Sequence, residues 1–158
     1  MKYSVLFVCM GNICRSPAAE GLFRARVLEA DLQDRIECDS AGTIGFHTGD
    51  LPDARMRKAA KARGYTLESR ARSVSTKDLH RFDELIAMDE QNLRDLQALQ
   101  AKSDGTAKLS LIRDYCRTHG KGDVPDPYYG GTQGFEMVLD LLEDACSGLL
   151  EAIRSRLA

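Results

Sequence analysis

Val5-Leu6-Phe7-Val8-Cys9-Met10-Gly11-Asn12-Ile13-Cys14-Arg15-Ser16-Pro17 is the stretch that decides the fold. Its first four residues are all apolar, which is typical of a strand buried on both faces of a sheet. Ser16 and Pro17 form a helix start signal, an N-cap residue followed by proline at the first helical position. The stretch therefore predicts a strand, a tight turn and a helix, the arrangement at which open α/β sheets bind ligands.

The turn between this strand and helix has the chemistry of an oxyanion site. Gly11 lets the backbone curl and Asn12 tolerates the left-handed conformation, so that N–H groups can converge on an anion. The helix N-terminus and the guanidinium of Arg15 add positive charge and a bidentate donor. Cys9 opens the turn, and the same donors favour its nucleophilic thiolate. We expect the anion to be bound through Met10, Gly11, Asn12, Ile13, Cys14 and Ser16.

The rest of the chain alternates strand and helix patterns, which predicts an α/β fold. Residues 36–42 alternate apolar and polar side chains, as a strand at the edge of a sheet does. Further strands are expected over 82–88 and 108–112, and helices after Pro17 and over 53–63, 89–101 and 135–157. Asp53 and Asp89 are the expected N-caps of the second and third helices.

A second informative stretch is Val124-Pro125-Asp126-Pro127-Tyr128-Tyr129-Gly130. The two prolines hold the chain extended and stiff around Asp126, so its carboxyl group has a defined direction. By itself the stretch would suit a surface turn. Beside a nucleophilic thiol, we expect Asp126 to act as a general acid, with Tyr128 and Tyr129 as aromatic walls for a ring.

Composition limits the classes of partner. At 158 residues, with 43% hydrophobic and 29% charged residues, the chain is expected to be a single domain over 1–158 with a sizeable core. A net charge of -2 gives no electrostatic reason to expect binding to nucleic acid or to an anionic membrane.

The apolar run after Met1-Lys2 is short for a signal peptide. Five cysteines without a spaced framework favour reduced thiols and a cytoplasmic location. The three histidines, His47, His80 and His119, are too scattered for a metal site, and no cofactor is expected.

Cys-Met-Gly-Asn-Ile-Cys-Arg-Ser-Pro at 9–17 resembles the Cys-x5-Arg phosphate loop of the low-molecular-weight protein tyrosine phosphatases. Met88-Asp89-Glu90 and Asp126-Pro127-Tyr128-Tyr129 also resemble motifs of this family, so the likeness covers both ends of the chain. With it we expect three layers, a four-stranded parallel sheet of order 2-1-3-4 flanked by helices. The resemblance implies metal-independent hydrolysis of phosphotyrosine in proteins by a monomeric enzyme that releases inorganic phosphate.

The resemblance also implies roles for individual residues. Cys9 is the nucleophile that becomes a cysteinyl-phosphate, Arg15 binds the phosphate and stabilises the transition state, and Asp126 is the general acid and base. Phe46 matches an aromatic wall of the family's cleft. The resemblance also implies that Cys14 can form a protective disulfide with Cys9, while the alternative is a small residue packed under the loop.

Two neighbouring residues have weaker assignments. Ser69 stands where the family often has a histidine that hydrogen-bonds the loop asparagine, which puts the support of Asn12 in doubt. His47, next to Phe46, has no partner in the sequence, and we expect it to be solvated rather than catalytic.

Four alternative functions make different demands on the sequence. Related arsenate reductases need two further cysteines near the middle of the chain, and residues 70–100 contain none. Protein-arginine phosphatases of the family tend to carry threonine where this chain has Ile13. A non-enzymatic oxyanion-binding module would trap phosphate on Cys9 without releasing it, and Asp126 argues against that. The nucleotide-binding pattern Gly-x4-Gly-Lys-[Ser/Thr] is absent from the sequence.

Overall fold

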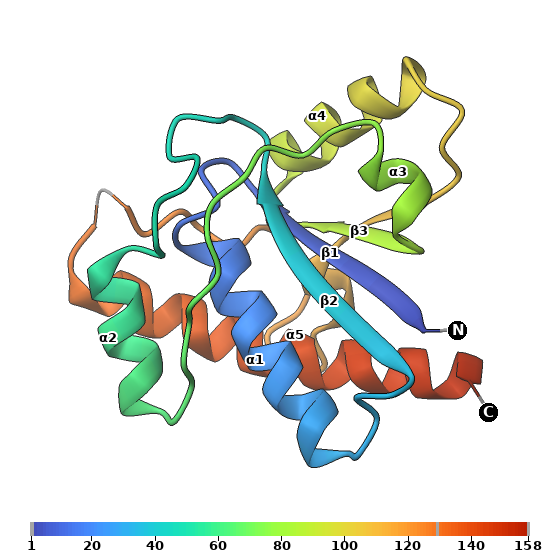
Figure 1. Ribbon diagram of the computed structural model, residues 1–158. Coiled ribbons are helices and arrows are strands. Elements are labelled where there is room, and N and C mark those ends of the chain that lie inside the picture. Colours follow the sequence, from blue (N-terminus) through green and yellow to red (C-terminus); the bar gives the residue numbers. More distant parts are fainter. Residues whose placement is uncertain (1, 129, 158) are drawn as a thin grey trace.

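The computed structural model describes residues 2–128 and 130–157 (Figure 1). The strands are β1 (Tyr3–Cys9), β2 (Ile36–Gly42), β3 (Glu84–Ala87) and β4 (Lys108–Leu111). The helices are α1 (Arg15–Glu29), α2 (Ala54–Ala62), α3 (Asp78–Arg81), α4 (Glu90–Ala101) and α5 (Thr132–Leu157), together with a 3₁₀ helix η1 (Ile112–Tyr115). Tyr129, expected to form part of an aromatic wall, lies outside the described residues.

The four strands form one parallel sheet in the order β2-β1-β3-β4, which confirms the predicted order. β1 is central and β2 is at an edge, as the solid and the alternating apolar patterns predicted. Cys9 pairs with Gly42, and Val8 pairs with Ala87, so the strands end together. The loops that leave β1, β2 and β3 therefore meet at one edge of the sheet.

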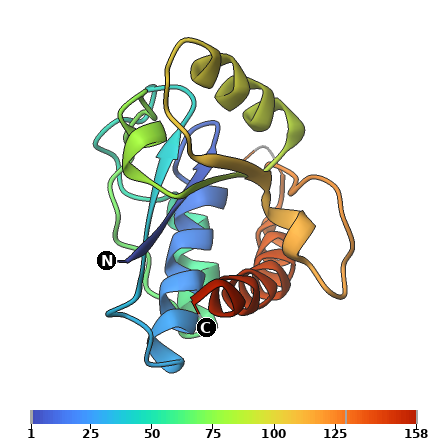
Figure 2. The same cartoon turned by 90° about the vertical axis from the view of Figure 1, so that its right-hand side faces the viewer.

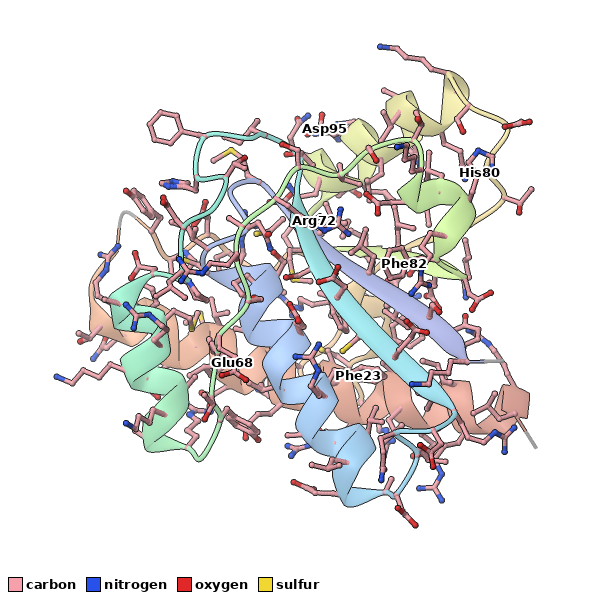
Figure 3. All side chains as sticks on the ribbon, viewed as in Figure 1. Phe23, Glu68, Arg72, His80, Phe82 and Asp95 are labelled. Atoms are coloured by element: carbon pink, nitrogen blue, oxygen red, sulfur yellow. The ribbon has the colours of Figure 1, made fainter. Side chains whose placement is uncertain are left out.

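Helices cover both faces of the sheet and make the three expected layers, which are seen most clearly in Figure 2. Val5 and Phe7 of β1 belong to the core cluster that includes residues of α1, α2 and α5. Leu6 and Val8, on the opposite face, belong to the cluster that includes residues of α3 and α4. The Phe7 ring packs edge-on against that of Phe23, at 5.6 Å between ring centroids. Phe23 is labelled on α1 in Figure 3. Burial of β1 on both faces explains its unbroken apolar sequence.

The start of α1 differs from the prediction. The helix begins at Arg15 with Cys14 as its N-cap, and no side chain caps it, so the assignment of Ser16 as N-cap was wrong. The Ser16 hydroxyl makes other hydrogen bonds, because it lies inside the helix and faces the loop that precedes it. The N-caps Asp53 and Asp89 are confirmed: their carboxylates accept from the Arg55 and Asn92 N–H groups.

Two short elements, α3 and η1, were not predicted from the sequence, and α5 begins three residues before the expected Phe135. A helix of one turn has too few residues to display an apolar period. The ends of the remaining strands lie within two residues of the prediction, which is the usual uncertainty of element boundaries.

A glycine pair in α5 tests how tightly this helix packs. A Cβ on Gly148 would lie 1.8 Å from the Tyr115 carbonyl oxygen of η1, whereas a Cβ on Gly134 would meet nothing closer than 3.5 Å. We expect Gly148→Ala to lower the free energy of unfolding by about 1–3 kcal/mol. Gly134→Ala is the matched control and should raise it by up to about 1 kcal/mol, through helix propensity alone. Urea unfolding measures both, and a stabilised Gly148→Ala variant would contradict the packing.

Candidate active site

The loop between β1 and α1 curls around the sulfur of Cys9. Asn12 has φ 59°, in the left-handed region that its side chain type tolerates, and its N–H donates to Cys9 Sγ at 3.3 Å. Ser16 Oγ lies 3.0 Å from the same sulfur. Cys9 is only 2% exposed, yet its sulfur is reached from a cavity that the loop lines. The sulfur thus has hydrogen-bond donors behind it and open space in front.

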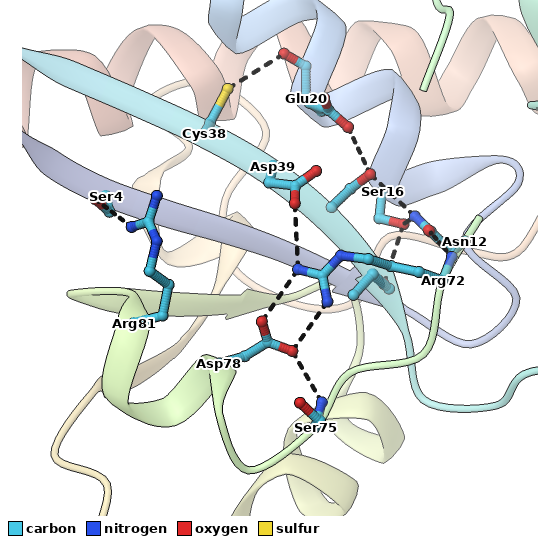
Figure 4. A network of polar contacts seen from close by, with 12 residues as sticks. Ser4, Asn12, Ser16, Glu20, Cys38, Asp39, Arg72, Ser75, Asp78 and Arg81 are labelled. Carbon is cyan, nitrogen blue, oxygen red and sulfur yellow. Dashed lines mark hydrogen bonds and ion pairs between the residues drawn. The ribbon is translucent and has the colours of Figure 1, made fainter. Parts of the chain in front are cut away.

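The side-chain amide of Asn12 holds this loop in place (Figure 4). Its nitrogen donates to Ser16 Oγ at 2.8 Å and to Ser40 Oγ at 3.0 Å, and its oxygen accepts from the Arg72 N–H at 3.0 Å. Because Ser16 Oγ accepts from Asn12, its own hydrogen is available to the Cys9 sulfur. The Asn12 amide therefore has partners for both its nitrogen and its oxygen, and none of these three contacts involves Ser69.

A second set of contacts fixes the partners of Asn12, as Figure 4 also shows. Ser40 donates to Glu20 Oε1 at 2.6 Å, which ties β2 to α1. The Arg72 guanidinium donates to both carboxylate oxygens of Asp78 at 3.1 Å and to Asp39 at 3.2 Å. These contacts hold the Arg72 backbone where its N–H meets Asn12.

Arg15 lies beside the loop and is 2% exposed. Its Nη1 donates to Asp89 Oδ2 at 2.6 Å and to the Val124 carbonyl at 3.1 Å, and its Nη2 reaches Asp126 Oδ2 at 3.5 Å. Burial alone would lower the pKa of Arg15, but Cys9, Asp89 and Asp126 outweigh it, and the net pKa is raised. The guanidinium therefore keeps its charge.

The two carboxylate oxygens of Asp89 make separate contacts. Its Oδ1 accepts from the Asn92 N–H at 2.7 Å and caps α4, while its Oδ2 holds Arg15. A carboxylate fixed at a helix N-terminus cannot swing toward solvent, so it orients the guanidinium as well as balancing its charge. Asp89 therefore supports the site by positioning Arg15.

The cavity in front of Cys9 has a volume of about 280 Å³. Its walls combine the loop with residues from distant segments: Cys9, Met10, Gly11, Ile13, Cys14, Arg15, Ile44, Phe46, His47, Asp126 and Tyr128. Asn12 and Ser16, two of the expected binding residues, hold the loop from behind rather than line the cavity. Asp126 faces Arg15, and its Oδ1 accepts from the Tyr128 N–H at 3.1 Å.

The rim of the cavity is aromatic. Phe46 is 83% exposed and packs edge-on against the His47 ring, at 4.9 Å between centroids. The His47 ring is 6.1 Å from that of Tyr128, and its Nδ1 lies 3.3 Å from Asp50 Oδ2. The His47 side chain is 21% exposed, so it remains partly solvated and also packs into the rim. Ile44, which sequence reasoning did not single out, lines the cavity because its N–H pairs with the Met10 carbonyl at 3.1 Å.

The described residues contain no group of three or more His, Cys, Asp or Glu side chains placed to hold a metal ion. Within the same ranges, no helix is both long and apolar enough to cross a membrane. All five cysteines are free thiols, including Cys9 and Cys14.

The cysteines should differ sharply in reactivity. Burial raises the pKa of Cys38 to about 12 and that of Cys116 to about 11, and it also raises the pKa values of Cys14 and Cys146. These four groups stay protonated at pH 7, and only thiolates attack alkylating reagents efficiently. We expect iodoacetate at pH 7 to modify Cys9 first, as measured by peptide mass spectrometry. Labelling of Cys14 at the same rate would contradict the geometry.

Comparison with known proteins gives one consistent result. The family model for low molecular weight phosphotyrosine protein phosphatase matches residues 4–158. A low molecular weight protein-tyrosine-phosphatase of Streptomyces coelicolor is 46% identical over 158 residues, covering 99% of this chain and 96% of that protein.

Solved structures agree with the sequence comparison. A protein tyrosine phosphatase from Entamoeba histolytica has a TM-score of 0.90 and 41% identity, covering 98% of this chain and 99% of its own. A Drosophila arginine phosphatase has a TM-score of 0.89 and 34% identity, covering 97% and 98%. The chain belongs to the low molecular weight phosphotyrosine protein phosphatase family.

Proposed function

We propose that this chain hydrolyses phosphotyrosine in proteins through a cysteinyl-phosphate intermediate, as a metal-independent protein-tyrosine phosphatase. The observation that carries the proposal is the convergence of Cys9, Arg15 and Asp126 on one cavity, from segments more than 100 residues apart. A nucleophile, an anion-binding guanidinium and a carboxylic acid are the groups that such a reaction needs.

In the first step the Cys9 thiolate attacks phosphorus in line with the leaving oxygen. The P–S bond forms as the P–O bond breaks, and Arg15 and the loop N–H groups hold the equatorial oxygens. Asp126 gives its proton to the departing phenolic oxygen, which leaves as neutral tyrosine. The hydrogen-bond donors around the sulfur favour the thiolate before the attack.

In the second step water attacks the cysteinyl-phosphate. Asp126, now a carboxylate, takes a proton from the water, the P–S bond breaks, and inorganic phosphate is released. The Ser16 hydroxyl, 3.0 Å from Cys9 Sγ, stabilises the departing thiolate. A module that only trapped phosphate would not need a carboxyl group among the residues that line the cavity.

The shape of the cavity supports an aromatic substrate. Phe46 and Tyr128 can pack against a phenyl ring, and the branched side chain of Ile13 adds an apolar contact near the phosphorus. The similar Drosophila protein is described as an arginine phosphatase, so phosphoarginine is the competing substrate class. Ile13 favours phosphotyrosine, because it offers no hydrogen bond to a guanidinium.

We further propose a single phosphatase domain over residues 1–158 that works as a monomer in the cytoplasm. The match of the family model over residues 4–158 supports the single domain, and the free thiols support the cytoplasmic location.

The assignment of roles is tested by two variants. We expect Cys9→Ser to abolish turnover, because a serine hydroxyl is not ionised in this setting. Asp126→Ala should slow hydrolysis by about 10²–10⁴-fold for poor leaving groups, since no proton is delivered to the leaving oxygen. A Cys9→Ser protein that hydrolysed 4-nitrophenyl phosphate at the wild-type rate would refute the proposal.

Ile13 is tested by competition between two substrates. Ile13→Thr should lower the ratio of kcat/KM for phosphotyrosine to that for phosphoarginine by about 10-fold, the effect of roughly 1.4 kcal/mol of lost apolar contact. Ile13→Val is the matched control, since it keeps the branched apolar surface. An unchanged ratio in Ile13→Thr would show that another residue sets the preference.

A further inference from the structure

Arg55 joins three segments of the chain around the cavity without lining it. It lies in the first turn of α2, beside the start of α5 (Figure 1), and its side chain is 45% exposed. An arginine this exposed can keep its charged end in water, so burial alone does not explain why its guanidinium has defined partners. Arg55 connects the phosphate loop, α5 and the segment 124–128, which carries Asp126 and is called the Asp126 loop below.

The link to the phosphate loop runs through Asp53. Arg55 Nε donates to Asp53 Oδ1 at 3.1 Å, and its Nη2 donates to Asp53 Oδ2 at 2.9 Å. The backbone N–H of Asp53 in turn donates to the Ile13 carbonyl at 2.8 Å. The hydrogen bond from Arg55 is the largest cause of a lowered pKa at Asp53, so this carboxylate stays ionised. The guanidinium is thereby fixed relative to the loop that holds Cys9.

The link to the Asp126 loop runs through Tyr128. Arg55 Nη2 donates to the Tyr128 carbonyl at 3.0 Å, and the guanidinium lies 5.5 Å from the centroid of the Tyr128 ring. The Tyr128 N–H donates to Asp126 Oδ1 at 3.1 Å. Arg55 therefore holds the residue that orients the carboxyl group.

The third contact of Arg55 fixes its guanidinium against α5. The Arg55 guanidinium lies 4.8 Å from the centroid of the Phe135 ring, and Phe135 is 1% exposed in the first turns of α5. A cation over a buried aromatic face is attracted to it and cannot rotate freely. Arg55 is thus held on one side while it holds Tyr128 on the other.

On the N-terminal side of Asp126, the loop is fixed at Val124. The Val124 N–H donates to the Met88 carbonyl at 2.8 Å and fixes the loop to the end of β3. The contact between Asp126 and Arg15 is long, at 3.5 Å, and the Asp126 side chain is 31% exposed. Arg55 thus adds a fixed point on the C-terminal side of Asp126, at the Tyr128 carbonyl.

We propose that Arg55 is a positioning residue that sets the distance between the phosphate loop and Asp126, and so controls proton delivery to the leaving group. This inference rests on the proposed phosphatase function. It predicts that Arg55 matters most for substrates whose leaving group needs the proton. It also predicts that lysine cannot replace Arg55, because one ammonium cannot hold Asp53, the Tyr128 carbonyl and two rings at once.

The test is kcat/KM for a series of aryl phosphates, from phenyl phosphate, with a poor leaving group, to 4-nitrophenyl phosphate, with a good one. For Arg55→Ala we expect a fall of about 10-fold or more with phenyl phosphate and of less than about threefold with 4-nitrophenyl phosphate, because general-acid catalysis is only partly lost. Arg55→Lys should behave like Arg55→Ala. Lys58→Ala, an exposed cation in the same helix, is the matched control and should leave the series unchanged.

A double-mutant cycle with Asp126→Ala decides whether Arg55 acts through Asp126. We expect Arg55→Ala to have no further effect on the leaving-group dependence once Asp126 is replaced. An equal fall across the whole series, or an equal effect in both backgrounds, would overturn the inference. So would a loss confined to acidic phosphopeptides, which would make Arg55 a contact for the protein substrate.

The outcome for the proposed function is read separately. If the unmodified protein does not hydrolyse aryl phosphates, the phosphatase proposal fails. If the unmodified protein and Asp126→Ala behave as expected while Arg55→Ala leaves the leaving-group dependence unchanged, only the positioning role of Arg55 fails.

Discussion

The hydrogen bond from the Asn12 N–H to the Cys9 sulfur is the interaction on which the site depends. It requires a left-handed backbone at Asn12, and that conformation persists because the surrounding structure holds the side-chain amide on both sides. The holding groups come from β2, from α1 and from the segment that carries Arg72. The sheet order therefore matters chemically: it brings Ser40 and Arg72 to the loop that follows β1.

Charge in the site is organised around one buried cation. Arg15 Nη1 donates to Asp89 and to the Val124 carbonyl, whereas Nη2 contacts Asp126 at a longer distance of 3.5 Å. An incoming phosphoryl oxygen can thus take over Nη2, leaving Asp126 to face the leaving group. The same guanidinium that stabilises a sulfur anion then stabilises the charge of the transferring phosphoryl group.

The framework of the fold could be predicted from the sequence, because β1, the turn and α1 each have a local sequence pattern. Ser16 was misassigned since a serine before proline has the same local signal whether it caps a helix or bonds a sulfur. The roles of Arg72 and Arg55 could not be predicted, because their partners Asn12 and Tyr128 lie 60 and 73 residues away. No period or propensity reports a contact across such a separation.

The central claim is that the phosphoryl group passes through the sulfur of Cys9. Its most direct test is acid quenching of Asp126→Ala during turnover of 4-nitrophenyl phosphate, followed by peptide mass spectrometry. Loss of the base should slow hydrolysis of the intermediate, so it should accumulate. The account predicts a phosphoryl adduct on the peptide that contains Cys9. An adduct on another residue such as His47, or turnover without any adduct, would contradict it.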